Sequence, residues 1–165
     1  INNDYIFNSE FIEYFSVILI SILILNAANL LYLGDNGAYL LSFFIGILLI
    51  DLSNHTKNLS PYYVVNLLWY PAYENLFSII RKLKEKKSAL KPDNSHLHQL
   101  FYLFLKKNII LPPKIINTIT GAIINLFNFF VFLTATHYYL NTQAQLIILF
   151  ATLAIYNLLY VVLKK

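Results

Sequence analysis

The sequence predicts an all-α membrane protein, a polytopic transmembrane helical bundle with about five spans. Hydrophobic residues make up 58% of the 165 residues, charged residues only 12%, and the mean hydropathy is +0.60. A water-soluble domain of this size would have difficulty burying so much apolar surface. Several apolar runs approach the roughly 20 residues that a helix needs to cross a hydrocarbon core of about 30 Å. Helices are favoured over barrel strands because the runs are long and uniformly apolar, and backbone amides in lipid must be satisfied within the segment.

The apolar spans are separated by polar or Pro/Gly-containing stretches. They cover residues 11–31, 38–52, 62–80, 115–136 and 144–163, and the second is the shortest. Residues 81–114 form a basic loop in which we expect a short helix between the third and fourth spans. We treat residues 1–165 as a single membrane domain. We expect it to be a piece of a longer protein, because the chain starts at Ile1 and residues 1–10 lack the features of a signal peptide.

The distribution of charge predicts the orientation in the membrane. If the spans alternate, residues 34–37, 81–114 and 164–165 lie on one side, and this side carries eleven of the twelve Lys and Arg residues. Residues 53–60 and 137–143 lie on the other side, with Lys57 alone. Because cationic loops stay in the cytoplasm, the basic loop is predicted to face the cytoplasm. The absence of cysteine excludes disulfides, thiolate nucleophiles and Cys-ligated metals.

Residues 34–37, Gly-Asp-Asn-Gly, join the first two spans on the basic side. Gly34 and Gly37 allow a tight turn that would expose the carboxylate of Asp35. An oxygen ligand of this kind suits a hard cation such as Mg2+. The alternative is that Asp35 or Asn36 only caps the helix that starts near Ala38.

Residues 91–100 form a second polar constellation. Pro92 blocks a helix from behind, and Asp93 or Ser95 can cap a helix that runs forward toward Lys107. His96 and His98 then lie in its first turn. They diverge by about 200° around the helix, so they do not form a same-face metal pair.

The start of this short helix is a candidate anion site. Free amides, the positive end of the helix dipole and imidazole donors all favour an anion there. The lysines of the loop add a positive field that would attract a diphosphate or an anionic lipid headgroup. These lysines are Lys82, Lys84, Lys86, Lys87 and Lys91. The alternative is a basic loop that serves topology and binds acidic lipids without specificity. Nucleic acid is not expected as a partner, because the patch lacks interleaved aromatic residues.

Polar residues also interrupt the apolar spans. Pro71 is expected to kink the third span, and Glu74 follows one turn later, with Arg81 as a possible ion-pair partner. The amides are expected to hydrogen-bond across helix interfaces. They are Asn26, Asn29, Asn66, Asn117, Asn125, Asn128 and Asn157.

Three motifs, in this order and with this sidedness, resemble those of the polyprenyl-phosphate N-acetylhexosamine-1-phosphate transferases, the family that includes phospho-MurNAc-pentapeptide translocase. Residues 34–37 resemble its Gly-Asp-x-Gly loop. Residues 71–74, with the basic pair 81–82, resemble its Pro-x-x-acidic helix. Residues 92–98 resemble its Pro-Asp-x-x-His-x-His signature. Two departures are Asn94, where the family commonly has Arg, and Gln99, where it often has a further His.

The resemblance implies a helical bundle of which this chain is the C-terminal half. It implies a bacterial cytoplasmic-membrane enzyme that moves a sugar 1-phosphate from a UDP-sugar to polyprenyl phosphate and releases UMP, starting cell-wall or surface polysaccharide synthesis. Asp35 is then the catalytic Mg2+ ligand, and His96 and His98 bind the phosphates of the UDP-sugar. Secondary substrate contacts fall to Asp93, Arg81, Lys82 and Lys91.

The resemblance also places a catalytic pair of aspartates upstream, so this fragment alone is expected to be inactive. Membrane lipids are expected partners, and a homo-oligomer is left open. The rival hypothesis is a non-catalytic transporter or membrane scaffold subunit whose basic loop binds anionic lipid.

Overall fold

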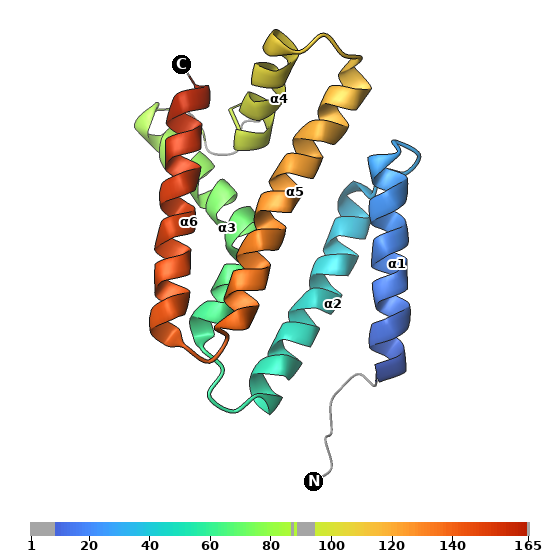
Figure 1. Cartoon of the computed structure of the whole chain (residues 1–165), viewed down its shortest axis with the longest axis vertical. Helices are drawn as coiled ribbons and strands as arrows, with labels where there is room; N and C mark the ends of the chain where they lie inside the picture. Colours follow the sequence, from blue (N-terminus) through green and yellow to red (C-terminus); the bar gives the residue numbers. More distant parts are fainter. Residues whose placement is uncertain (1–8, 87, 89–94, 165) are drawn as a thin grey trace. The chain divides into compact units, whose positions relative to one another are not determined.

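The predicted all-α fold is confirmed. The computed structural model describes residues 9–86, 88 and 95–164, and its regular structure there is helical throughout. Figure 1 shows the helices in chain order: α1 (Ser9–Ala27), α2 (Gly34–His55), α3 (Pro61–Lys84), α4 (Leu97–Asn108), α5 (Pro113–His137) and α6 (Thr142–Leu163).

Within the described residues, four helices are long and apolar enough to cross a membrane, namely α1, α2, α5 and α6. Their outer faces carry exposed apolar side chains, as on α6, where Ile147 is 69% and Phe150 67% exposed. Such surfaces are those of a bundle that faces lipid. The chain is therefore a multi-pass membrane protein. Helix α3 occupies the remaining predicted span but is more polar than these four.

Several predicted boundaries move by about a helical turn. Helix α2 is 22 residues long and exceeds the predicted span 38–52 at both ends. Helix α1 ends at Ala27, before the predicted end, and Asn29 follows in the left-handed region with φ 58°. Helix α3 continues to Lys84, so Arg81 and Lys82 lie in its last turn and not in the loop 81–114. Cationic side chains stabilise that end of a helix through its dipole.

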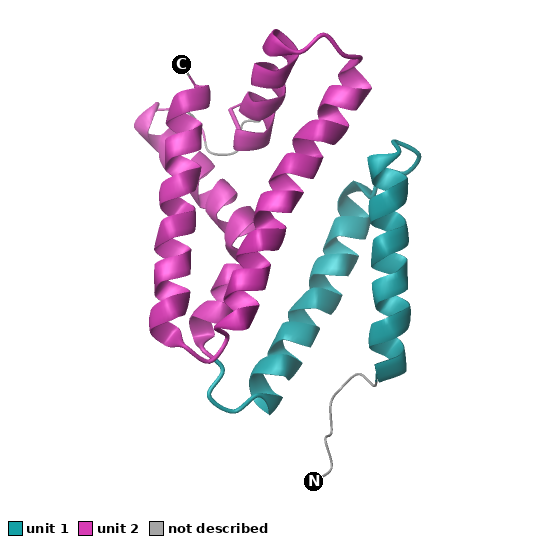
Figure 2. Cartoon of the chain, in the orientation of Figure 1, with its two compact units in different colours: residues 1–59 teal, residues 60–165 magenta. Residues whose placement is uncertain are grey.

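The chain forms two compact units, Ile1–Leu59 and Ser60–Lys165 (Figure 2). In the first unit, α1 and α2 are joined by a turn and meet through aromatic rings. Phe11 and Phe15 of α1 lie 6.1 Å and 5.6 Å, between ring centroids, from Phe44 of α2. This unit holds the Gly-Asp-Asn-Gly segment at the start of α2.

In the second unit, α3 packs against α5 and α6, and α4 packs against the same two helices. The buried core joins Trp69 of α3, Leu97 of α4, Val131 of α5, and Tyr156 and Tyr160 of α6. The buried side chains of α3 are largely polar: they include Asn66, Glu74, Ser78, Arg81 and Lys82. The residues that lower the hydropathy of α3 are therefore turned into the bundle.

Helix α3 runs from one end of the α5–α6 pair to the other. At its start, the Ser60 N–H donates to the carbonyl of Tyr139 in the α5–α6 turn (3.0 Å). At its end, Lys164 after α6 lies 3.5 Å from Glu85 after α3. If α5 and α6 cross the membrane, α3 crosses it with them. The fifth span stays a prediction with this support.

The expected interhelical amide bonds are confirmed for two asparagines. Asn66 of α3 donates to the main-chain oxygen (3.0 Å) and the side-chain oxygen (2.6 Å) of Gln145 in α6. Asn157 of α6 donates to the Tyr73 hydroxyl of α3 (2.8 Å). In contrast, Asn128 donates to Ile124 of its own helix (3.1 Å). The first two amides therefore fix α3 against α6.

Candidate functional site

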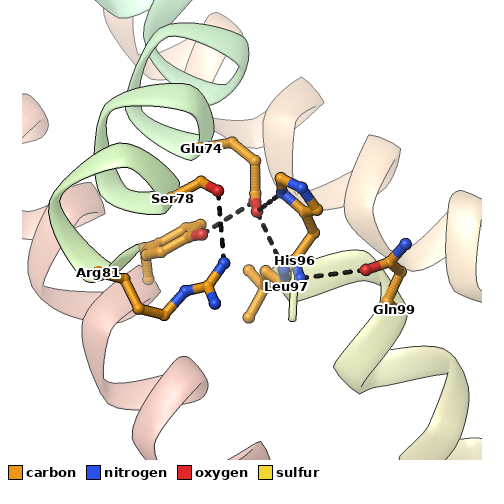
Figure 3. A network of polar contacts seen from close by, with 7 residues as sticks. Glu74, Ser78, Arg81, His96, Leu97 and Gln99 are labelled. Atoms are coloured by element: carbon orange, nitrogen blue, oxygen red, sulfur yellow. Dashed lines mark hydrogen bonds and ion pairs between the residues drawn. The ribbon is translucent and has the colours of Figure 1, made fainter. Parts of the chain in front are cut away.

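The start of α4 is held against α3 by one buried carboxylate, Glu74. Its Oε1 atom lies 3.0 Å from Nδ1 of His96 and accepts the main-chain N–H of Leu97 (3.1 Å). Its Oε2 atom accepts the hydroxyl of Tyr156 from α6 (2.9 Å). Figure 3 shows the Glu74 side chain directed at His96 and Leu97. The carboxylate thus ties α3, α4 and α6 together at one point.

This arrangement satisfies a group that would otherwise be costly. Glu74 is 8% exposed, and a buried charge is tolerated when it is paired and hydrogen-bonded. The Leu97 amide is one of the first amides of α4, which have no partner inside the helix. The carboxylate also sits at the positive end of the α4 dipole. Glu74 therefore occupies part of the anion position that the sequence suggested for a substrate phosphate.

The structure brings Nδ1 of His96 to the Glu74 carboxylate, for which the sequence had suggested Arg81 as an ion-pair partner. Arg81 follows two turns later on α3, and its Nη2 donates to Ser78 Oγ (3.3 Å). The α4 segment brings a ring nitrogen and a main-chain N–H to the carboxylate. Arg81 and Lys82 are nonetheless both buried, so the basic pair is turned toward the interior of the second unit.

Helix α4 begins one position later than the histidine motif suggested. His96 is the N-cap residue, with extended backbone angles (φ −78°, ψ 150°), and Leu97 is the first helical residue. The side chain of Gln99 accepts the His96 N–H (3.2 Å) and closes this first turn. Gln99, which departs from the family pattern, therefore has a local capping role. Ser95, one of the two expected caps, precedes the N-cap residue. Asp93, the other expected cap, and Lys91 lie outside the described residues.

The rings of His96 and His98 lie alongside each other, with centroids 5.8 Å apart and planes inclined by 18°. The predicted divergence of about 200° is wrong because His96 has an extended and not a helical backbone. His96 is partly buried, whereas His98 is exposed. Desolvation by the packed chain lowers the pKa of His98 below 6.5; the negative charge of Glu74 opposes this shift, and His96 adds to it. His98 is therefore mainly neutral at pH 7.

The predicted metal ligand Asp35 lies in the first unit, and the histidines lie in the second. Asp35 is in the first turn of α2 and is exposed, and the N-cap residue Leu33 makes no side-chain cap bond. Helix α2 thus begins at Gly34, before the expected Ala38, so a cap by Asp35 at Ala38 does not form.

The two glycines of this segment have distinct geometry. Gly34 has φ +66°, which favours glycine, and a Cβ on Gly37 would meet the Leu33 side chain at 2.8 Å. The sharp turn predicted for the segment is therefore present at Gly34.

The exposed carboxylate of Asp35 suits a Mg2+ ion that takes one or two protein oxygens and completes its shell with phosphates and water. Among the residues that the structure describes, no three His, Asp or Glu side chains gather as a metal cluster. Asp35 as a Mg2+ ligand stays a prediction.

Tyr156 is the site residue that the sequence analysis missed. It is fully buried, and it lies 82 positions from the carboxylate that it contacts. Within an apolar helix, a tyrosine is equally consistent with plain core packing. The pattern of α6 contains no signal that selects this residue.

The chain is similar to known proteins over only part of its length. No family model matches the chain, and no solved structure matches it. The chain is 31% identical over 75 residues to a protein of Bacillus subtilis (strain 168) named "Probable undecaprenyl-phosphate N-acetylglucosaminyl 1-phosphate transferase". The match covers 45% of this chain and 21% of that protein, so the chain spans about a fifth of the relative's length.

Proposed function

We propose that the protein carrying this chain transfers a sugar 1-phosphate, from a UDP-N-acetylhexosamine, to polyprenyl phosphate and releases UMP. The reaction is placed at the cytoplasmic face of a bacterial inner membrane, at the start of cell-wall or surface polysaccharide synthesis. This chain is proposed as the C-terminal part of the enzyme, and catalysis also needs acidic residues upstream. The partial similarity to a transferase of this kind supports the proposal.

The observation that carries the proposal is the histidine pair at the start of α4. A buried carboxylate of α3 holds it in place, and its rings lie side by side at 5.8 Å. Side chains fixed by a rigid support are suited to bind a phosphate group without reorganisation. The support comes from α3, α4 and α6 of the second unit, and α6 is a candidate membrane span.

The chemistry requires two polyanions to meet. A bound Mg2+ would offset their repulsion, and Asp35 is the proposed ligand from this chain. His96 and His98 are proposed to lie against the diphosphate of the UDP-sugar, with His98 donating a hydrogen bond to it. Arg81 and Lys82 add positive potential from the last turn of α3, with Lys91 and Asp93 as further proposed contacts. The membrane keeps the acceptor phosphate at the interface, which lowers the entropic cost of the encounter.

The test is transfer of radiolabelled sugar phosphate into the lipid phase by the full-length protein. Asp35→Asn is expected to abolish Mg2+-dependent turnover, and His98→Ala is expected mainly to raise KM for the UDP-sugar. Glu13→Gln removes another exposed carboxylate of the first unit, and His137→Ala removes the exposed histidine that ends α5. Both control variants are expected to keep wild-type activity.

Near-normal rates in Asp35→Asn or His98→Ala would reject the corresponding assignment. If the wild-type protein released no UMP and bound acidic vesicles in a salt-sensitive way, the transferase proposal would fail. The lipid-binding scaffold would then be favoured.

A further inference from the structure

We infer that Glu74 is a positioning residue that holds His96 as the Nδ1–H tautomer, so that its Nε2 atom is a hydrogen-bond acceptor for a hydroxyl or N–H group of the sugar donor. The inference rests on the proposed function for the identity of the bound group. Its structural part, the tautomer and the orientation of the ring, concerns this chain alone and can be measured without substrate.

The tautomer follows from the two groups that share one oxygen. The Leu97 main-chain nitrogen can only donate, so Oε1 of Glu74 acts as an acceptor at 3.1 Å. Nδ1 of His96 lies 3.0 Å from the same oxygen. A ring nitrogen that faces an accepting oxygen at this distance must carry the proton. Nε2, on the opposite edge of the ring, is therefore directed away from Glu74.

The carboxylate is itself prevented from turning. Its second oxygen accepts the hydroxyl of Tyr156, a residue with no exposed surface. Leu97, which supplies the main-chain donor, is 5% exposed. Hydrogen bonds in such surroundings are stronger than in water, and a fully satisfied network specifies one geometry. Two of these bonds come from the start of α4 and one from α6, so the ring of His96 has little freedom to rotate.

The fixed orientation of the His96 ring determines which of its nitrogen atoms a ligand meets. A histidine at an N-cap with a freely rotating ring would present either nitrogen to a ligand. With Nδ1 bound to Glu74, the ring presents one nitrogen, next to the exposed ring of His98. A carboxylate that orients a histidine through its second nitrogen is a recurrent device in binding and catalytic sites.

The replacement of Glu74 by Gln and by Met separates orientation from charge. In Glu74→Gln, the Leu97 amide requires an acceptor, so the amide oxygen should take the Oε1 position and keep the bond from Nδ1–H. The amide NH2 group would then face the Tyr156 hydroxyl, which can accept it. Glu74→Met has a similar length but no acceptor. Glu85→Gln is the matched control, because this partly exposed carboxylate follows the end of α3 and pairs with Lys164.

The first measurement is 15N NMR of histidine-labelled full-length protein in lipid bilayers near pH 7, with the His96 signal identified by its loss in His96→Asn. We expect the Nδ1–H tautomer in the wild type, in Glu74→Gln and in Glu85→Gln, and a mixture of tautomers in Glu74→Met. An Nε2–H tautomer in the wild type would overturn the inference, whatever the activity of the protein.

The second measurement is steady-state transfer. Glu74→Met is expected to raise KM for the UDP-sugar by about tenfold or more, with a smaller change in kcat, whereas Glu74→Gln should stay near the wild type. Equal loss in the Gln and Met variants would show that charge, and not orientation, is required, and would contradict the inference. If the wild type shows the expected tautomer but transfers no sugar phosphate, the proposed function fails while the orientation of His96 stands.

Discussion

At the residue scale, the cost of burying Glu74 is offset by three donors. Two come from the start of α4 and one from Tyr156 of α6. Removing one donor leaves part of the carboxylate without a partner in the interior, and a bond to a charged group contributes more than a neutral one. The stability of the second unit should therefore respond to single atoms at this point.

Tyr156→Phe tests this cost with a matched control. Loss of the hydroxyl is expected to destabilise the protein by about 1.5–3 kcal/mol, because a buried carboxylate oxygen loses its donor. The Tyr160 hydroxyl is buried and has no hydrogen-bond partner among the described residues, so Tyr160→Phe should be neutral or slightly stabilising. Unfolding of both variants in the same detergent measures the difference. Equal effects would contradict the account of Glu74.

His98 gives a prediction about pH. Desolvation lowers its pKa below 6.5, so the ring is neutral at pH 7 and gains its charge only as the pH falls below 6.5. The diphosphate of a UDP-sugar stays anionic over this range, so its binding should strengthen with acidification. We expect KM for the UDP-sugar to fall between pH 7 and pH 5.5 in the wild type, more than in His98→Asn. Identical pH profiles for the two proteins would show that His98 does not contact the phosphates.

At the element scale, helix α3 carries the amides and charges that join the second unit. Its buried face includes Asn66, Glu74 and Ser78, and the bonds from Asn66 reach α6. In a membrane the hydrophobic effect does not drive helices together, so packing and interhelical hydrogen bonds carry much of their association. This explains why the most polar of the long helices is also the most enclosed.

The bond between Asn66 and Gln145 can be measured by a double-mutant cycle. The two Ala variants, separately and together, should give a coupling free energy of about 0.6–1.7 kcal/mol, the range for hydrogen bonds between membrane helices. Asn128→Ala is the control, since the amide of Asn128 bonds within its own helix. It should show no coupling to Gln145→Ala. A coupling free energy near zero for Asn66 and Gln145 would mean that their hydrogen bonds do not stabilise the packing of α3 against α6.

The helices could be predicted from the sequence because each apolar run is a local property of consecutive residues. Their boundaries could not, because they depend on caps and charges. Helix α3 continues to Lys84, one turn beyond the predicted end of the span, and His96 is the N-cap residue of α4. The bond between Glu74 and Tyr156 also could not be predicted, since it joins residues 82 positions apart and depends on which faces of two helices meet. The histidine motif itself was visible, but the relation between its rings was not.

At the scale of the whole molecule, the second unit has two distinct ends. Ser60, Tyr139 and Thr142 lie at one end, and Glu85 and Lys164 lie at the other. The distribution of Lys and Arg predicts that the second end faces the cytoplasm. The same rule predicts that the Asp35 turn of the first unit lies on the cytoplasmic side, as the proposed function requires.

The most direct test of this account is the sidedness of the Asp35 turn relative to the histidine segment. The chain has no cysteine, so Asn36→Cys, Ser88→Cys and Gln143→Cys can each report alone, in a full-length protein with no other cysteine. An impermeant maleimide should label positions 36 and 88 only from the cytoplasmic side and position 143 only from the opposite side. Labelling of positions 36 and 88 from opposite sides would contradict the proposed function.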